Sequence, residues 1–278
     1  MSVITRDRET ERNRIIAAVA AHGGLKWALR DSRVLMRRSL LRYVRVPALM
    51  VFSVIQPIMF VLLFRYVFGG AIATGRPGVD YVDFLMPGIF VQTSIFGAAA
   101  TGIFLAEDLK TGMIERFKSL PMARSALLVG RTASDTVRNI FTVLLMIAVG
   151  YLVGFNFAAG FLPAVAAVAL AVSFAFPFTW ISALIGLSVR DAETAQAASF
   201  PWMFPLTFLS SAFVPIQFMP ELLQVFARNN PVTLAVDALR SLVLGGPTAD
   251  SVVKTMVWIV GLTVVFAPLA VRKYRQVS

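Results

Sequence analysis

Hydrophobic residues in this sequence are gathered into six long runs, which polar residues separate. A helix needs about 20 apolar residues to cross the hydrocarbon core of a bilayer, so runs of this length predict membrane-spanning helices. The six predicted spans are residues 47–68, 84–106, 136–157, 161–189, 194–219 and 252–271. The sequence therefore predicts an all-α membrane protein with six transmembrane helices.

An amphipathic helix is predicted before the first span, over residues 25–45. Its apolar face, surrounded by arginines, is typical of a helix that lies along the inner leaflet. The apolar face consists of Leu25, Leu29, Met36, Leu40 and Tyr43. Residues 1–24 are interpreted as a cytoplasmic tail and residues 25–278 as a single membrane domain. The amphipathic helix either anchors the chain only or also binds a partner.

Two short helices are predicted between the fifth and sixth spans, one on each side of residue 230. Prolines begin the first helix and follow its end, and paired glycines at 245 and 246 end the second. Because each helix is too short to cross a bilayer, we expect a re-entrant or surface-lying hairpin on the outer side, serving as a plug or as a substrate gate. Asp237 and Arg240, three residues apart, are expected to pair. The residues singled out in this hairpin are Pro220, Asn230, Pro231, Asp237 and Arg240.

The basic residues predict how the chain is oriented. It holds 26 Lys and Arg against 15 Asp and Glu, and most of the basic residues fall on one side of the predicted spans. Because cytoplasmic loops are enriched in Lys and Arg, both termini are expected in the cytoplasm. The chain is 58% hydrophobic and its basic residues lie between apolar runs, which argues against a nucleic-acid-binding protein.

One cytoplasmic stretch, residues 107–138, is too long for a tight turn. Gly112 and Pro121 bracket a short predicted helix over residues 113–120, on which Phe117 and Leu120 form a small apolar face. A protruding helix of this kind suits docking into a groove on another protein. A solvated charged loop is the alternative.

Missing residue types and motifs exclude several functions. The predicted spans hold no Asp, Glu or Lys far from their ends, which argues against an ion-coupled carrier. The chain has no cysteine and one histidine, and it lacks the P-loop, the His-Glu-x-x-His motif and the Gly-x-Ser-x-Gly motif. We therefore expect no ATP site, no metal site and no enzymatic activity in this chain.

The polar groups within the predicted spans are neutral. They suit hydrogen bonds between helices, or a weakly polar route for an amphipathic or lipid-like molecule. The candidates for such a route are Gln56, Gln92, Thr93, Ser94, Thr207 and Ser210.

Two motifs in this order, together with six spans, resemble the permease subunits of type-2 ABC transporters, and most closely the daunorubicin-resistance group of actinobacterial drug and lipid exporters. The first motif is the run Gly-Met-Ile-Glu-Arg-Phe-Lys-Ser-Leu-Pro over residues 112–121. The second comprises Phe213-Val214-Pro215, Met219-Pro220, Asn230-Pro231-Val232-Thr233, Asp237-Ala238-Leu239-Arg240 and Gly245-Gly246. The resemblance covers roughly residues 25–275.

The resemblance implies a permease of an ATP-driven exporter of hydrophobic or amphipathic cargo in a bacterial cytoplasmic membrane. Two copies of a separate P-loop ATPase would bind ATP and Mg, and a second permease, identical or a sister chain, would complete the unit. The amphipathic helix would connect to the ATPase, and the cargo route would run along spans 1, 2 and 5. The helix that couples to the ATPase would hold Glu115, Arg116, Phe117, Lys118, Leu120 and Pro121. Export of a polysaccharide or other polymer, and a membrane scaffold without transport, are the alternatives.

Overall fold

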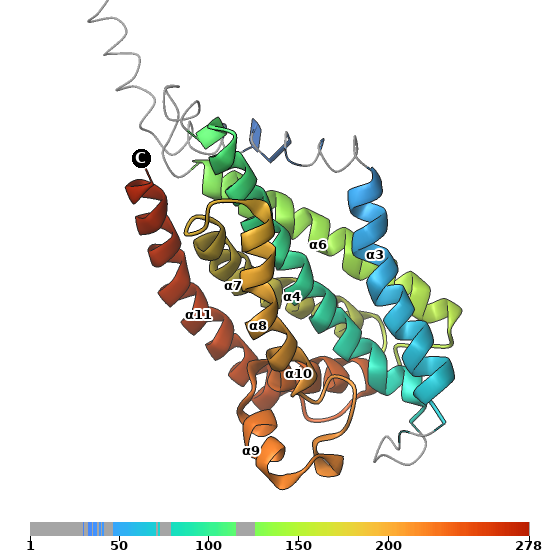
Figure 1. Ribbon diagram of the computed structural model, residues 1–278. Helices are drawn as coiled ribbons and strands as arrows, with labels where there is room; N and C mark the ends of the chain where they lie inside the picture. The colour runs from blue at the N-terminus through green and yellow to red at the C-terminus, as the bar shows by residue number, and fades with distance from the viewer. Residues whose placement is uncertain are drawn as a thin grey trace, which may run out of the picture.

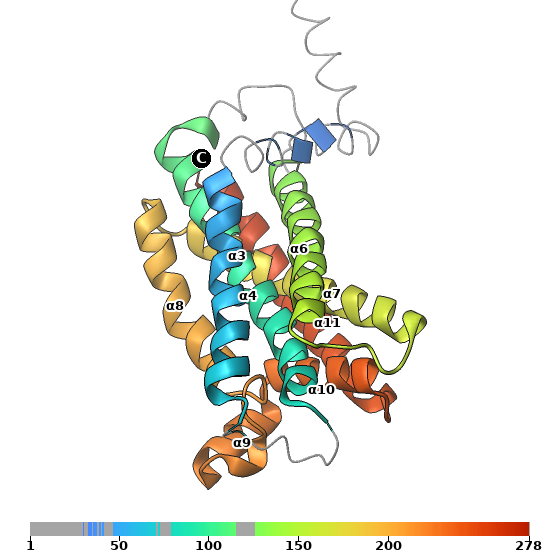
Figure 2. The ribbon, with the colours of Figure 1, turned by 90° about the vertical axis from the view of Figure 1, so that its right-hand side faces the viewer.

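The computed structural model describes residues 47–70, 72, 79–114 and 126–277, together with residues 30, 33, 34, 36, 37, 39 and 41. All regular structure in these ranges is helical (Figures 1 and 2). The elements are α3 (Pro47–Leu62), its π-helical continuation η1 (Leu63–Phe68), α4 (Tyr81–Lys110), α6 (Ala126–Leu152), α7 (Phe161–Gly186), α8 (Ala192–Phe208), the 3₁₀ turn η2 (Ile216–Phe218), α9 (Glu221–Asn229), α10 (Pro231–Leu244) and α11 (Ala249–Gln276).

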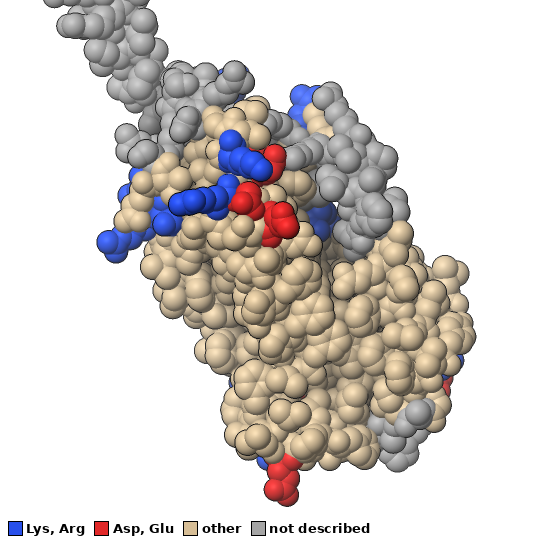
Figure 3. All heavy atoms as spheres, viewed as in Figure 1, with Lys and Arg blue, Asp and Glu red and all other residues tan. Residues whose placement is uncertain are grey.

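Four helices in the described ranges are long and apolar enough to cross a bilayer. They are Tyr81–Lys110, Leu128–Leu152, Phe161–Gly186 and Ala249–Gln276, and a shorter apolar helix covers Val54–Phe68. On the outside of the molecule, large apolar side chains such as Leu152, Val257 and Val264 are exposed. Figure 3 shows a broad uncharged surface between a cluster of charges at one end and an acidic tip at the other. The chain is therefore a multi-pass membrane protein.

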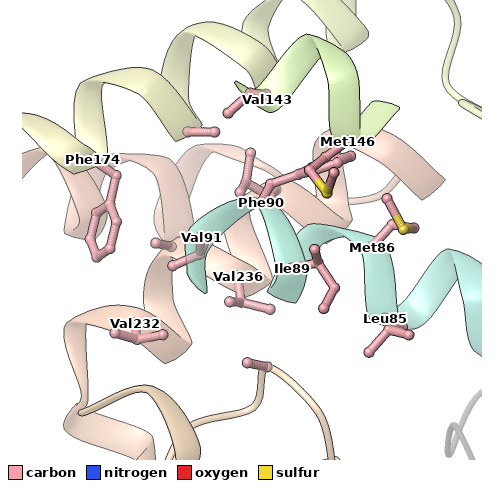
Figure 4. Packing of buried hydrophobic residues seen from close by; sticks show 14 of the residues in the cluster. Leu85, Met86, Ile89, Phe90, Val91, Val143, Met146, Phe174, Val232 and Val236 are labelled. Atoms are coloured by element: carbon pink, nitrogen blue, oxygen red, sulfur yellow. The ribbon is translucent and has the colours of Figure 1, made fainter. Parts of the chain in front are cut away.

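Helix α4 is the centre of the bundle and packs against α6, α7, α8 and α10. Its residues Leu85, Met86, Ile89 and Phe90 are buried in the main apolar cluster, where Figure 4 shows them close to side chains of α6, α7 and α10. The backbones of α4 and α7 approach closely at Gly102 and Gly186. A Cβ added to Gly186 would lie only 2.2 Å from the Gly102 carbonyl oxygen. Small residues at a helix contact are a common packing device in membranes.

The predicted fifth span, residues 194–219, was wrong in its second half. Helix α8 ends at Phe208, and residues 209–215 form turns before η2. The terminal carbonyl groups of α8 are satisfied from another element, since the Asn230 side-chain amide donates to the carbonyl oxygens of Leu206 (2.7 Å) and Leu209 (2.9 Å). A helix whose last carbonyl groups accept hydrogen bonds from another element can end there without leaving those groups unsatisfied.

Four other helices also begin or end away from the predicted limits, and among them α7 ends at Gly186, three residues before its predicted limit. Helix α6 begins at Ala126, ten residues before the predicted span, so that Asp135 lies inside a helix and is only 2% exposed. Helix α4 extends past both predicted limits, from Tyr81 to Lys110. Helix α11 also extends past both, and Lys254 in its first turns pairs with Asp250 at 2.7 Å.

Candidate functional site

The two short helices predicted between the fifth and sixth spans are present as α9 and α10. Pro220 precedes α9, Pro231 is the first residue of α10, and the Asn230 side chain accepts a hydrogen bond from the Val232 backbone N–H (2.9 Å). Both helices lie at the end of the bundle opposite the C-terminus (Figures 1 and 2). Helix α10 is inserted among α4, α7 and α11, and Val232, Val236 and Leu239 are fully buried. In contrast, the apolar side chains Leu222, Val225 and Phe226 of α9 are exposed.

Arg240 of α10 is at the centre of a buried polar network. Its guanidinium donates to the carbonyl oxygens of Phe84 (3.0 Å), Ser211 (2.6 Å) and Ala212 (3.2 Å), and it lies 3.5 Å from the centre of the Phe84 ring. It also contacts Asp237 at 3.3 Å, which confirms the predicted pair. Arg240 therefore fastens the turn that follows α8 to both α4 and α10.

Neighbouring contacts reinforce this turn. The Ser211 hydroxyl donates to Asp237 (3.0 Å), and the Tyr81 hydroxyl donates to the Phe213 carbonyl oxygen (3.1 Å). Ser210 and Thr207, two candidates for the cargo route, belong to the same region. The Ser210 hydroxyl donates to the Thr207 carbonyl oxygen (2.5 Å), and both residues are buried. The bonds of Ser211 and Tyr81 hold the turn against α10 and α4, whereas the bond of Ser210 is local to the end of α8.

A separate cavity of about 210 Å³ lies between α3, α4, α6 and α8. Three of the six residues predicted for the cargo route line it, namely Gln56 of α3 and the pair Gln92 and Thr93 of α4. Arg138 of α6 and Gln196 of α8 complete its polar lining together with a few hydroxyl groups, while Phe96, Phe200 and Met203 form apolar walls. The structure thus brings part of the predicted route together but leaves Thr207 and Ser210 outside it.

Two cavity residues of α4 differ in how their polar atoms are satisfied. The Thr93 hydroxyl donates to the Ile89 carbonyl oxygen (2.6 Å), as hydroxyls within helices often do. Gln92 is 3% exposed, and its Oε1 has no hydrogen-bond partner among the described residues. Because buried polar atoms are nearly always hydrogen-bonded, this amide needs a partner that the described chain does not supply. Ser94 faces away from this cavity and accepts a hydrogen bond from Asn139 (3.4 Å).

A polar seam joins α4 to α6 beside the cavity. Arg131 and Asp108 form one buried ion pair (3.7 Å), and Arg138 and Asp135 form another (3.7 Å). Asp135 also accepts a hydrogen bond from the Thr101 hydroxyl (2.5 Å), and Arg138 donates to the Gly97 carbonyl oxygen (2.6 Å). We define the α4–α6 seam as these six residues.

This seam was not predicted, because residues 107–138 were assigned to a cytoplasmic stretch. One signal was available: Arg131, Asp135 and Arg138 are spaced by four and three residues, so they share one face of a helix.

In the described part of the chain, no group of three or more His, Cys, Asp or Glu residues could hold a metal ion.

The predicted coupling residues, Glu115, Arg116, Phe117, Lys118, Leu120 and Pro121, lie outside the described residues, as does most of the predicted amphipathic helix over residues 25–45. The flanks of the coupling segment are described. Helix α4 ends before Gly112, whose φ of 65° is one that glycine adopts freely. Ile114 is buried in a second apolar cluster with Leu128 of α6 and Tyr274 of α11. The segment that connects α4 to α6 therefore begins and ends at the same end of the bundle as the C-terminus.

Comparison with known proteins identifies the kind of chain to which these features belong. The family model described as ABC-2 type transporter matches residues 30–244. The daunorubicin resistance ABC transporter permease protein DrrB1 of Streptomyces coeruleorubidus is 32% identical over 86% of this chain and 84% of its own. The probable doxorubicin resistance ABC transporter permease protein DrrC of Mycobacterium tuberculosis H37Rv is 26% identical over 87% of both chains. The putative transport permease ycf38 of Cyanophora paradoxa is 28% identical over 75% of this chain and 72% of its own.

Proposed function

The chain belongs to the ABC-2 type transporter family, and on that basis we propose that it is the permease subunit of an ATP-driven exporter of hydrophobic or amphipathic cargo, a drug or a lipid. The observation that carries this proposal is the cavity between α3, α4, α6 and α8, which combines amide groups with aromatic walls inside an apolar bundle. The two relatives named for daunorubicin and doxorubicin resistance support a drug as the cargo.

In this proposal six segments cross a bacterial cytoplasmic membrane, and both termini are cytoplasmic. The segment Pro47–Phe68, formed by α3 and η1, and the region of α8 supply the two spans beyond the four long helices. Basic residues support the orientation, since Arg272, Lys273 and Arg275 at the end of α11 lie at the same end of the bundle as Lys110 of α4. The hairpin of α9 and α10 then faces the outside, as a re-entrant or surface-lying element.

The energy would come from a separate P-loop ATPase that binds ATP and Mg. Residues Glu115–Pro121 would dock on this ATPase, and they lie in the connection between α4 and α6. Because the Arg131–Asp108 ion pair and hydrogen bonds from Thr101 to Asp135 and from Arg138 to Gly97 join these two helices, a movement of the docked segment would displace them together and change the cavity that both line. Two ATPases and a second permease, identical or a sister chain, would complete the unit.

The test is to replace charged residues at the two ends of the molecule. Glu115→Ala and Arg116→Ala are expected to reduce ATP-driven transport in membrane vesicles, and to weaken copurification of the ATPase, while leaving the amount of permease in the membrane unchanged. Glu221→Ala and Arg228→Ala, at exposed positions of α9, are matched controls that keep both properties. Unchanged transport in the first two variants would remove the coupling assignment. A chain that purifies without any ATPase would favour a scaffold role instead.

A further inference from the structure

Phenylalanines recur at every fourth position on two helices that both pack against α4. Three lie on α3 and its continuation η1, and three lie on α8. In order they are Phe60, Phe64 and Phe68, and then Phe200, Phe204 and Phe208. The centres of successive rings are 5.3 to 6.0 Å apart, within the range in which aromatic rings attract one another. Each helix therefore carries a row of rings in contact.

Phe213, in the turn after α8, joins the two rows. Its ring centre lies 5.1 Å from that of Phe208 and 4.7 Å from that of Phe64, with interplanar angles of 20° and 18°. Phe60 also contacts Phe208 directly, at 6.0 Å between ring centres. Phe213 is 4% exposed, and its carbonyl oxygen accepts a hydrogen bond from the Tyr81 hydroxyl. We define the phenylalanine ladder as these seven phenylalanines, which connect α3 to α8.

One end of the phenylalanine ladder opens into the cavity. Phe200 lines the cavity together with Phe96 of α4, and the Phe96 ring lies 5.3 Å from the Phe204 ring in an edge-to-face contact. The ladder ends at Phe68, the last residue of η1, and this continuation of α3 ends at the same end of the bundle as α9 (Figures 1 and 2). Phe68, Phe200 and Phe204 are 40%, 41% and 38% exposed, so ring surface is accessible at both ends of the ladder.

The chemistry of the phenylalanine ladder favours one kind of cargo. An acyl chain gains from a phenylalanine ring only what it gains from any apolar surface of the same area. A planar aromatic molecule gains more, because stacked and edge-to-face contacts add an attraction beyond the burial of area, equal to about a twofold to tenfold gain in affinity for each ring pair. The accessible rings therefore distinguish flat aromatic molecules from saturated ones of the same size.

The cavity and the phenylalanine ladder complement each other in size. Sites for drug-sized molecules measure about 300–1,000 Å³, and the cavity of about 210 Å³ is smaller. It can hold one part of an amphipathic molecule beside the amide of Gln92, whose buried Oε1 has no hydrogen-bond partner among the described residues. The remainder of the molecule then lies against Phe200 and Phe204, where the ladder begins.

Taking the proposed function as given, we propose that the phenylalanine ladder, where it meets the cavity, is a binding site for polycyclic aromatic cargo and selects it over saturated, lipid-like cargo. Phe200 and Phe204 provide the stacking surface beside the cavity, and Phe96 borders it from α4. Phe213 keeps the two rows together, because Arg240 holds the turn in which it lies. Of the two cargo classes in the proposed function, this site favours a drug with flat rings over a lipid.

The experiment compares two uncharged competitors that differ only in their ring system. Anthracenemethanol is flat and aromatic, and its fully hydrogenated counterpart is saturated. Each competes with tritiated pyrenebutanol for the purified transporter complex in phosphatidylcholine nanodiscs, followed by scintillation proximity, and empty nanodiscs give the correction for partition into lipid. After this correction we expect the aromatic competitor to bind about tenfold more tightly than the saturated one.

Single substitutions locate the source of this preference. Phe200→Leu and Phe204→Leu each remove one accessible ring and keep an apolar side chain, so each is expected to reduce the preference about threefold or more. Phe204→Trp keeps an aromatic face and should keep the preference within about twofold. The control is Phe161→Leu at the start of α7, where the side chain is 84% exposed and outside the ladder, and it should also leave the preference within about twofold. The apparent melting temperature of each variant checks that it is folded.

Several outcomes would overturn the proposal. They are an absence of saturable pyrenebutanol binding, equal corrected affinities for the two competitors, and the same response to Phe204→Leu as to Phe161→Leu. If the ladder were instead a contact between two permeases, Phe204→Leu would reduce the amount of second permease in the complex and leave the ring preference unchanged, which also contradicts the proposal.

Failure of the proposed function gives a different result. A chain that purifies without an ATPase removes the exporter, but the same competition, measured on the chain alone, still decides whether the phenylalanine ladder binds aromatic rings. Conversely, ATP-driven transport by a complex that shows no ring preference would keep the proposed function and remove the aromatic site.

Discussion

Two buried arginines, Arg240 of α10 and Arg138 of α6, show how differently one residue type is used. Arg240 donates hydrogen bonds to three backbone carbonyl groups, and the side chain of its acidic partner Asp237 is 44% exposed. Arg138 is paired with a carboxylate that is itself buried, and it lines a cavity. The first arginine joins three segments of backbone, whereas the second presents charge to a space that a ligand can enter. A buried arginine therefore has to be interpreted from what its guanidinium faces.

The largest effect is expected from Arg240→Leu. This change leaves three carbonyl oxygens without their donor and frees the turn after α8, so it should lower the free energy of unfolding by about 3–5 kcal/mol. The measurement is the apparent melting temperature of the detergent-purified protein, followed by size-exclusion chromatography. Arg228→Leu, at an exposed position of α9, is the control and should change the melting temperature little. Similar losses in both variants would refute the fastening role of Arg240.

The ion pair of Arg138 and Asp135 should show energetic coupling. Asp135→Asn leaves the buried Arg138 without its counter-charge, and Arg138→Gln leaves the carboxylate alone. The double variant should therefore lose less unfolding free energy than the sum of the two single losses. The coupling energy in a double-mutant cycle should be about 1–3 kcal/mol. The cycle is measured by unfolding in mixed detergent micelles. Additive losses would mean that the two residues do not act as a pair.

The helices were predictable where local signals mark their ends. Prolines before α9 and at the start of α10, and Gly245 after α10, fixed those two helices almost to the residue. The end of α8 depends instead on Asn230, more than twenty residues further along the chain. The start of α6 depends likewise on α4, because Arg131 and Asp135 resemble loop residues until their partners Asp108 and Thr101 are known. Sequence periodicity contains no information about such distant partners.

The cavity was predictable only in part for the same reason. Gln56, Gln92 and Thr93 stood out because polar residues are unusual within apolar runs. Thr207 and Ser210 stood out equally, yet they lie outside the cavity, where the Ser210 hydroxyl donates to the Thr207 carbonyl oxygen. Arg138 was not among the predicted residues, and its place in the cavity wall follows from the packing of α6 against α4. Composition identified unusual residues, but the packing decided which of them meet.

Two glycines of α4 extend the comparison between the arginines. A Cβ on Gly88 would lie 2.2 Å from the Ala212 carbonyl oxygen, in the turn that Arg240 holds, whereas a Cβ on Gly97 would lie 3.1 Å from the Arg138 guanidinium. Backbone cannot yield easily but the end of a side chain can, so Gly88→Ala should cost about 1–3 kcal/mol and Gly97→Ala less. Both are compared by apparent melting temperature, with Gly261→Ala on α11 as a control that meets no atom within 4 Å. A larger loss from Gly97→Ala would reverse the distinction between a fixed turn and an adjustable guanidinium.

The smallest effect is expected where the ion-pair contact is shortest. Lys254 and Asp250 are 2.7 Å apart, closer than Arg138 and Asp135 at 3.7 Å, but their side chains are 55% and 78% exposed. Water already solvates both charges, so Lys254→Gln should change the free energy of unfolding by about 0.5 kcal/mol or less. The same unfolding assay in mixed micelles, repeated at low and high salt, measures this change beside the Asp135→Asn loss. If Lys254→Gln lowers the free energy of unfolding as much as Asp135→Asn does, then burial does not set the strength of ion pairs in this bundle. The difference between the exposed pair and the buried pair would then have to rest on geometry alone.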